Sequence, residues 1–444
     1  MRTTDNNLGN CIVADPADYH NLSQIANKKI SKIRLQDRSN LLVFPSRWGE
    51  LNDKVEEASI FSLQQDNRLT TFNTMGFVGL NETQLTISSR FAPQKGGDYF
   101  LHFMLQKVFG INVFNLDQTP DKESIWDFML YLFPYFLKKA IYQGIYKEYK
   151  RKAFNDPNAK GAINIKRHIQ LNRPFTGNIA YSNRVHSYDN KVTQLIRHTI
   201  EFIKKHKLSK NVLWNDIDTI AAVNKILCAT AGYRLNDREK IIRENQRPFH
   251  HPYYLEYERL IRLCLQILRY EKLTFGREKD RIYGILFDGA WLWEEYLSTI
   301  LNKFEFTHPE NKKATNGIKL FSNNRKTIYP DFYSIKKDTV IDAKYKTLQR
   351  HDLGREDLYQ MMTYMYRLKL DTGIILYPFQ DEGNLHRQEQ LLMHPESYGG
   401  KDASIIKYGF PIPQKTKNYE DFKKQMKNEE KQLIRNQITK KRQH

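Results

Sequence analysis

The chain has 444 residues, a length that predicts two or three domains, and its 40% hydrophobic content indicates folded domains rather than disorder. Its formal net charge of +20 favours a polyanion as partner and predicts binding that weakens with salt. No apolar run reaches the roughly 18 residues of a membrane helix, and no signal-peptide pattern opens the chain. The three cysteines lack the spacing of metal ligands. We therefore expect reduced thiols in a cytoplasmic protein.

Residues 1–118 are predicted to form a β-rich N-terminal domain. Its clearest element is a hairpin over residues 75–90, with Asn81 and Glu82 in the turn. Residues 99–109 then take helical spacing. A phosphate-binding loop of the P-loop type occurs nowhere in the sequence, so any nucleotide-driven motor must be another chain.

Residues 119–275 are predicted to form a helical middle region. A long amphipathic segment opens at Asp121 and runs to about Lys152, and Pro134 is expected to kink or split it. Its basic end, residues 147–152, is interpreted as a solvated helix face, with a stripe that contacts phosphates as the alternative. A further helix is predicted to begin after Asp189 or Asn190.

The most informative stretch is a predicted hairpin over residues 327–346. Two β-rich runs flank a polar turn at residues 336–338. Asp342 and Lys344, two residues apart, point to the same side of their strand, and the hairpin brings Asp331 beside them. Two carboxylates and an ammonium on one face form a site for a hard divalent cation and a phosphate. The alternative is a charged solvent face on an ordinary hairpin.

Predicted helices flank this hairpin on both sides. Residues 287–297 read as an amphipathic helix with an acidic pair, Glu294 and Glu295. Residues 357–364 read as a second helix, with Gln360 and Tyr364 one turn apart on one face. A buried strand follows over residues 372–377. For Gln360 and Tyr364 the alternative is a helix packing face. A second carboxylate pair, Asp352 and Asp357, is assigned to a loop and a helix cap.

Residues 381–444 are predicted to be a C-terminal extension with a basic tail. From Lys415 to His444 the chain contains ten Lys and Arg residues against four Asp and Glu residues, and most of it from Tyr419 on has a helical pattern. We interpret the tail as a solvated basic helix, with a DNA-gripping tail as the alternative.

Pro330-Asp331 and Asp342-Ala343-Lys344 together resemble the motif of the PD-(D/E)xK nuclease superfamily, and the order of elements around them is that of the branch with RecB-like nucleases. The resemblance implies hydrolysis of a phosphodiester bond with Mg²⁺, for which Mn²⁺ would substitute. Asp331, Asp342 and the backbone carbonyl of Ala343 would hold the metal ion. Lys344 would orient or help to deprotonate the attacking water and offset charge on the phosphate.

Further residues take roles from the same resemblance. Glu294 follows Trp293, where the superfamily places a glutamate after an aromatic residue, and would be an accessory metal ligand. The sequence does not fully separate it from Glu295, which reads otherwise as a surface carboxylate. Gln360 and Tyr364 would hold the DNA strand or surround the metal ligands.

A closer resemblance covers roughly residues 70–380. Its parts in chain order are Ile87-Ser-Ser-Arg90, Leu137-Lys-Lys-Ala140, Lys160-Gly-Ala-Ile-Asn-Ile165, Asp189-Asn190, Trp293-Glu-Glu-Tyr296 and the hairpin motif. This order is similar to the McrC family, the nuclease subunits of McrBC-type and LlaJI-type restriction systems. The resemblance implies that the N-terminal domain docks onto a McrB-like hexameric AAA+ GTPase and stimulates its hydrolysis. It also implies that this partner recognises methylated or otherwise modified DNA.

The sequence thus predicts an α+β multidomain protein with a β-rich N-terminal domain, a helical middle region and a C-terminal α/β PD-(D/E)xK nuclease core over residues 276–380. It would be the DNA endonuclease subunit of a McrBC-type restriction system. One rival is a RecB-like repair or processing nuclease. The other is a non-catalytic nuclease-fold adaptor of an AAA+ motor, which is disfavoured because both aspartates and the lysine are present.

Overall fold

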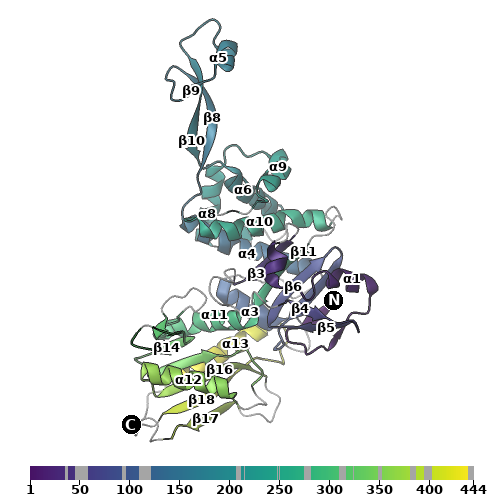
Figure 1. Ribbon diagram of the computed structural model, residues 1–444, viewed down its shortest axis with the longest axis vertical. Helices are drawn as coiled ribbons and strands as arrows, with labels where there is room; N and C mark the ends of the chain where they lie inside the picture. The colour runs from purple at the N-terminus through teal and green to yellow at the C-terminus, as the bar shows by residue number, and fades with distance from the viewer. Residues whose placement is uncertain are drawn as a thin grey trace. The chain divides into compact units, whose positions relative to one another are not determined.

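A computed structural model describes the chain except residues 36–38, 46–58, 93–96, 110–121, 207–211, 215, 248, 250, 275–281, 310–316, 324, 349–352, 381–386, 395–402 and 439–444. The chain divides into two compact units (Figure 1). One unit combines residues 1–124 with residues 276–444, and the other comprises residues 125–275. Both contain helices and sheets, so the fold is a mixed α and β multidomain arrangement, as predicted.

The first sheet of the discontinuous unit joins N-terminal strands to one strand from much later in the chain. Its strands, in the order β1-β7-β6-β11-β3, are β1 (Arg2–Thr4), β7 (Thr83–Ser88), β6 (Thr74–Leu80), β11 (Ile282–Asp288) and β3 (Ser39–Phe44). β6 and β7 form the hairpin predicted over residues 75–90, which is confirmed. β11 runs parallel to β3 and antiparallel to β6. Residues 282–288, predicted to belong to the nuclease region, pair instead through their backbone with the N-terminal strands.

Two glycines let β6 and β11 approach each other closely. Gly76 has φ +123° and Gly284 has φ +157°, both in the region that favours glycine. A Cβ on Gly76 would lie 2.1 Å from the backbone oxygen of Ile285, and a Cβ on Gly284 would lie 2.3 Å from that of Phe77. The pairing of these two strands therefore depends on glycine at both positions.

Smaller elements pack around this sheet. A three-stranded sheet contains β2 (Cys11–Ile12), β5 (Arg68–Thr71) and β4 (Phe61–Leu63). The helices are α1 (Pro16–Ser23), α2 (Ile30–Leu35) and α3 (Tyr99–Phe109), the last as predicted. Leu41, Val78 and Leu286 of the large sheet share one buried core with Ile25 and Ile30. The N-terminal region is therefore α and β, held together by long-range contacts.

The second five-stranded sheet of the same unit carries the predicted nuclease motif. Its order is β14-β15-β16-β18-β17, with β14 (Phe332–Ser334), β15 (Thr339–Ala343), β16 (Thr372–Phe379), β18 (Ser404–Pro411) and β17 (Gln388–Leu392). β14 and β15 are the predicted antiparallel hairpin, and β16 is the predicted buried strand. β15, β16 and β18 are parallel to one another. Two strands thus come from beyond residue 380, where the sequence analysis places an extension.

Helices lie against this second sheet. They are α11 (Gly289–Leu301), α12 (Arg355–Leu368) and α13 (Tyr419–Leu433), each of which overlaps a predicted helix. Met361 and Met365 of α12 pack with Val340 and Ile375 of the sheet in one core. Short elements are also present, namely η2 (Asn302–Phe304), β12 (Ile318–Lys319), β13 (Thr327–Ile328) and η5 (Ile434–Ile438). α12 is consequently a fixed support for the residues of the hairpin.

Residues 125–275 form helices with an extended β arm (Figure 1). The helical elements are α4 (Lys122–Tyr142), α6 (Lys191–Lys204), α8 (Ile217–Ala229), η1 (Leu235–Asp237), α9 (Arg238–Glu244) and α10 (Leu255–Thr274). The arm contains β8 (Glu148–Asp156), β9 (Ala162–Ile163), α5 (Ile165–Leu171) and β10 (Ile179–Ser187). Asn190 caps α6 through a capping box with Thr193, which confirms the predicted helix start.

The middle region, predicted to be mostly helical, also contains the three-stranded sheet of β8, β10 and β9. One prediction for this region is wrong. The long amphipathic helix ends at Tyr142 rather than near Lys152, and it continues through Pro134 without splitting. Gly144, with φ +94°, follows the helix end. Residues 147–152 therefore do not form a helix face, and most of them pair in β8 with β10.

The described residues include no helix that is both long and apolar enough to span a bilayer.

Candidate active site

The hairpin of β14 and β15 places the two predicted aspartates opposite each other. Phe332 pairs with Ile341, so Asp331 and Asp342 are the next pair along the register. Opposite residues of an antiparallel pair project to the same face. Asp331 Oδ2 also accepts a hydrogen bond from the backbone N–H of Ala343 at 2.7 Å. The structure thus brings together both carboxylates and the backbone of the third predicted ligand.

The two carboxylates share an environment that disfavours charge. Burial, followed by the nearby charge of Asp342, raises the pKa of Asp331 to about 8. Burial also raises the pKa of Asp342, and Lys344 partly offsets this effect. At neutral pH the metal-free pair consequently retains a proton.

Lys344 lies between two carboxylates. Its Nζ is 2.8 Å from Asp342 Oδ2 and 3.3 Å from Asp357 Oδ1. It also donates a hydrogen bond to Gln360 Oε1 at 2.9 Å. Burial alone would lower the pKa of Lys344, but these carboxylates together with Asp331 raise it above its ordinary value. Lys344 is therefore an ammonium ion held in one place, with 15% of its side chain exposed.

Gln360 and Tyr364 extend this network along one face of α12. Gln360 Nε2 donates to the hydroxyl oxygen of Tyr364 at 2.7 Å, and that hydroxyl donates to the backbone oxygen of Tyr329 at 3.2 Å. Tyr364 is 5% exposed. Both residues face the hairpin, and a hydrogen-bonded chain connects them to Lys344. Their roles toward DNA stay predictions.

The structure separates the two neighbouring glutamates of α11. Glu295 Oε1 accepts a hydrogen bond from Trp291 Nε1 within the helix at 3.0 Å. Glu294 Oε1 lies 3.8 Å from His308 Nε2. The pKa of Tyr364 is raised by burial and also by the charges of Asp342, Asp331 and Glu294. Glu294 therefore faces the same site as both aspartates, whereas Glu295 contacts its own helix.

His308 belongs to the site although no sequence motif contains it. Its Nδ1 lies 2.6 Å from the backbone oxygen of Asp331, which can only accept, so Nδ1 carries the proton. Its ring stacks on Phe332 with centroids 4.7 Å apart. A bridge between Thr307 and Tyr333 carries the segment alongside β14. Only this tertiary pairing brings the imidazole next to Asp331.

Asp357 is the other residue that the sequence analysis does not place in the site. Gly354 rather than Asp357 occupies the cap position of α12. The Asp357 carboxylate instead contacts Lys344 and, at 3.1 Å, Lys346 Nζ. Burial alone would raise the pKa of Asp357, but these two lysines hold it below the ordinary value. Asp352 lies outside the described residues.

The donor set at the hairpin fits a hard divalent cation. Within the described ranges no group of three or more His, Cys, Asp and Glu side chains has the spacing of a metal cluster. Glu294, the predicted accessory ligand, is therefore not grouped with Asp331 and Asp342, and the set that remains combines these two carboxylates with the main-chain oxygen of Ala343. In the metal-free protein, burial and then the charge of Asp342 disfavour the charged form of Asp331. A divalent cation between the two carboxylates would relieve their repulsion and replace the retained proton.

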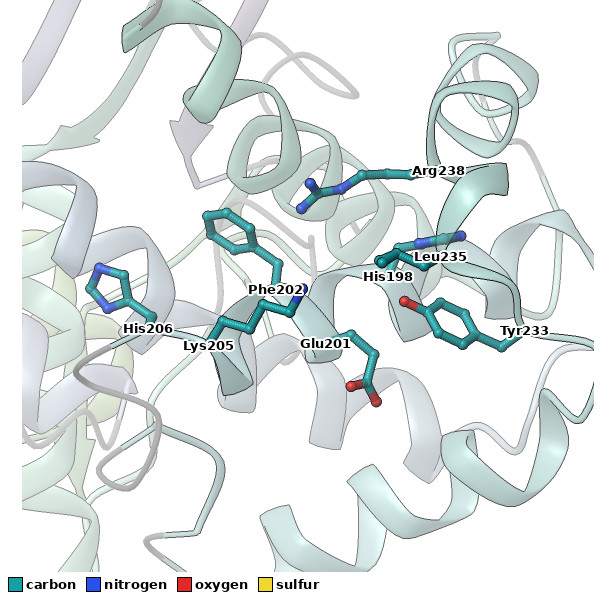
Figure 2. A pocket seen from close by; sticks show the side chains of 8 residues that line it. All are labelled: His198, Glu201, Phe202, Lys205, His206, Tyr233, Leu235 and Arg238. Carbon is teal, nitrogen blue, oxygen red and sulfur yellow. The ribbon is translucent and has the colours of Figure 1, made fainter.

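A separate hollow of about 180 Å³ lies among residues 125–275 (Figure 2). It is lined by His198, Glu201, Phe202, Lys205, His206, Tyr233, Leu235 and Arg238. His198 is 2% exposed, neither of its ring nitrogens has a hydrogen-bond partner among the described residues, and its ring lies 4.7 Å from that of Tyr233. None of the predicted site residues lines this hollow, so it is distinct from the hairpin site.

Comparisons with known proteins match the chain to a family model and to solved structures. The model of the McrBC 5-methylcytosine restriction system component family matches residues 69–378. A half-complex from a tetradecameric assembly of Thermococcus gammatolerans McrB AAA+ hexamers with bound McrC is 15% identical, covers 85% of this chain and 88% of that chain, and gives a TM-score of 0.45. The Thermococcus gammatolerans McrBC complex, also 15% identical, covers 66% and 83% with a TM-score of 0.32. No curated protein matches the chain.

Proposed function

The chain belongs to the family of McrBC 5-methylcytosine restriction system components, and from this premise we propose that it is the DNA endonuclease subunit of such a system, with a PD-(D/E)xK core. The proposal rests on the arrangement of charged side chains at the hairpin site. Asp331 and Asp342 lie opposite each other, and the Lys344 ammonium is 2.8 Å from Asp342. Membership of the family shows neither catalysis nor a metal, so the chemistry rests on this geometry.

The chain's own residues would divide the work as follows. Asp331, Asp342 and the carbonyl of Ala343 would hold the cation, with Glu294 as accessory ligand. Bound Mg²⁺ supplies charge stabilisation at the phosphate and lowers the pKa of a coordinated water. The raised pKa of Lys344 makes it a donor at neutral pH. It would orient the attacking water and donate to a phosphate oxygen, rather than take the water's proton.

The network on α12 would keep Lys344 in place. Lys344 Nζ has three fixed partners, the carboxylates of Asp342 and Asp357 and the amide oxygen of Gln360. Tyr364 in turn fixes the Gln360 amide. Such preorganised support is what electrostatic catalysis requires, because the donor need not move when charge develops. DNA would approach from the face that Gln360 and Tyr364 share with the hairpin.

We further propose that this chain works with an AAA+ GTPase. The similar Thermococcus gammatolerans assembly consists of McrB AAA+ hexamers with bound McrC. This sequence contains no P-loop of its own, so the hydrolysed nucleotide would be bound by the partner. The N-terminal domain, residues 1–118, would dock onto the partner, and the partner would recognise the modified base. The net charge of +20 suits a subunit that holds DNA.

The experiment is Mg²⁺-dependent cleavage of methylated and unmethylated plasmid by this chain together with the AAA+ protein encoded beside it, with GTP or ATP. Lys344→Ala is the test variant. Lys336→Ala is the matched control, because Lys336 lies in the turn of the same hairpin with 75% of its side chain exposed. Cleavage that requires nucleotide, partner and Lys344, but not Lys336, is the expected result.

Two outcomes would redirect the proposal. If the chain stimulates nucleotide hydrolysis by the partner but DNA is not cleaved under any of these conditions, a non-catalytic nuclease-fold adaptor would be favoured. Cleavage that needs an ATP-driven helicase and ignores methylation would favour a RecB-like repair or processing nuclease.

A further inference from the structure

Tyr345 follows Lys344 directly and is buried against the N-terminal strands. It is 4% exposed. Its hydroxyl lies 2.8 Å from Ser89 Oγ, just after β7, and 3.3 Å from Met75 Sδ in β6. Its ring meets that of Phe91 edge to face, with centroids 5.1 Å apart. The residue next to the candidate catalytic lysine is therefore held by the other sheet of the same unit.

A buried ion pair fixes one face of the Tyr345 ring. The Arg90 guanidinium lies 5.0 Å from the ring centroid. Arg90 binds Asp5 through Nε at 2.9 Å and through Nη2 at 2.6 Å, and Asp5 is fully buried. Both nitrogens donate to the same oxygen, Asp5 Oδ2, and the backbone N–H of Arg90 donates to Asp5 Oδ1, so Asp5 holds the backbone and the guanidinium of Arg90 together. Arg90 thus forms a rigid surface against which the Tyr345 ring rests.

The Tyr345 ring also packs against the start of the helix that carries Glu294. A Cβ on Gly289, the first residue of α11, would lie 2.7 Å from Tyr345 Cε1, so the ring needs glycine there. The backbone N–H of Gly289 donates to the backbone oxygen of Asn73 at 2.8 Å. One aromatic ring therefore lies at the junction of the N-terminal sheet, the strand end that carries Lys344 and the helix that carries Glu294.

We propose that Tyr345 is a positioning residue through which the N-terminal sheet sets the place of Lys344, an inference that rests on the proposed function. The Lys344 backbone is held on the other side, where its N–H donates to the oxygen of Leu376 in β16 at 2.9 Å. Tyr345 supplies the second anchor. If Tyr345 served only to fill space, an apolar ring would suffice. Its hydroxyl instead contacts the Ser89 hydroxyl, and its ring rests on the Asp5–Arg90 ion pair. Buried polar groups such as these must keep their partners, so they restrict Tyr345 to one position.

The test compares two buried tyrosines that each lose their hydroxyl group. Tyr345→Phe removes the contacts with Ser89 and Met75. Tyr419→Phe is the matched control, because Tyr419 is 5% exposed and donates to Gln106 Oε1 at 2.7 Å, between α13 and α3. In the full chain with its partner, Tyr345→Phe is expected to lower the cleavage kcat about tenfold while KM for DNA stays unchanged, because misplacing a catalytic group acts on kcat. Tyr419→Phe is expected to leave both kcat and KM for DNA unchanged.

A second readout does not depend on activity. Hydrogen exchange of peptides that span residues 340–346 should be faster in Tyr345→Phe than in the wild type and in Tyr419→Phe. Ser89→Ala should change the exchange in the same direction, and the double variant should change it by less than the sum of the two, because both substitutions remove the Tyr345–Ser89 contact. A purely structural loss would lower the unfolding temperature of both tyrosine variants equally without a local change in exchange.

These readouts keep the two hypotheses apart. If the wild-type complex does not cleave DNA, the proposed function fails, and the exchange comparison still decides the role of Tyr345. Unchanged exchange over residues 340–346 in Tyr345→Phe, or a cleavage kcat equal to that of the control, would overturn the positioning role.

Discussion

Replacing Asp331 by Asn should stabilise the metal-free protein and abolish cleavage at the same time. The wild-type carboxyl has a pKa of about 8, raised from 3.8 by burial and by Asp342. Folding at neutral pH therefore requires Asp331 to take up a proton that the unfolded chain lacks. An asparagine keeps an oxygen for the Ala343 N–H and carries no charge, so it avoids this cost.

The size of the effect follows from linkage. Between the ordinary pKa of 3.8 and pH 7, the folded protein binds one more proton than the unfolded chain. At about 1.4 kcal/mol per pH unit, the loss of folding free energy at pH 7 has an upper limit of about 4 kcal/mol. Asp331 is partly exposed, so water and local relaxation reduce the penalty, and we expect about 2 kcal/mol. For a unit of this size that corresponds to a rise of roughly 4–6 °C in the unfolding temperature.

The assay is thermal unfolding of wild type and Asp331→Asn in EDTA across pH 4 to 9. Because the folded pKa is raised, wild-type stability falls as pH rises from about 4 to about 8, so the advantage of the variant should open over that window and stay constant above it. Added Mg²⁺ should raise the unfolding temperature of the wild type only. A difference that is the same at pH 5 and pH 8, or a variant less stable at pH 8, would refute the reasoning.

Asp357→Asn is the matched control of opposite sign. Lys346 and Lys344 outweigh burial and lower the pKa of Asp357. This carboxylate therefore contributes stability that is present above its ordinary pKa and lost as pH falls through its folded pKa. The control variant should be less stable than the wild type at pH 7.5, while Asp331→Asn is more stable.

Three further predictions concern the chemistry and the charge. Lys344→Met should lower the single-turnover cleavage rate about 100-fold or more with little change in DNA affinity, and a loss confined to affinity would contradict its proposed role. His308→Ala should raise the Mg²⁺ concentration for half-maximal cleavage about tenfold, because the imidazole supports Asp331; an unchanged metal titration would remove His308 from the site. DNA affinity measured by fluorescence anisotropy should fall steeply between about 50 and 200 mM salt, and a flat dependence would argue against phosphate contacts as the main source of binding.

Local pattern was sufficient for the elements that carry the motif. The hairpin of β14 and β15, helix α12 and strand β16 lie where alternation, helical spacing and a short apolar run predict them. Asp331 and Asp342 are opposite because a hairpin has few registers. The same local reasoning failed at residues 147–152, a basic, helix-compatible run of which residues 148–152 pair instead with β10, between 31 (Lys152 with Asn183) and 39 (Glu148 with Ser187) positions later.

Glu294 and Glu295 show where a one-dimensional pattern is insufficient. Both stand on α11 at adjacent positions. Glu294 lies near His308, whereas Glu295 accepts a hydrogen bond from Trp291 of its own helix. His308 itself reaches Asp331 through an isolated bridge between Thr307 and Tyr333. In the sequence, Asp357 looks like an ordinary acidic residue in the first turn of a helix. Its contact with Lys344 follows from how α12 packs against the hairpin.

By itself, the sequence determined which charged and polar groups the hairpin and α12 carry and how they are spaced, since residue type, spacing of two along a strand and spacing of four along a helix are local properties. Tertiary structure alone decided which sheet β11 joins, that β17 and β18 extend the second sheet, and that Tyr345 touches Ser89 and Arg90. The physical reason is separation along the chain. Tyr345 and Ser89 are 256 positions apart. Pairing and packing over such separations depend on the shapes of both partners, and the periodicity within either segment does not indicate which partner it meets.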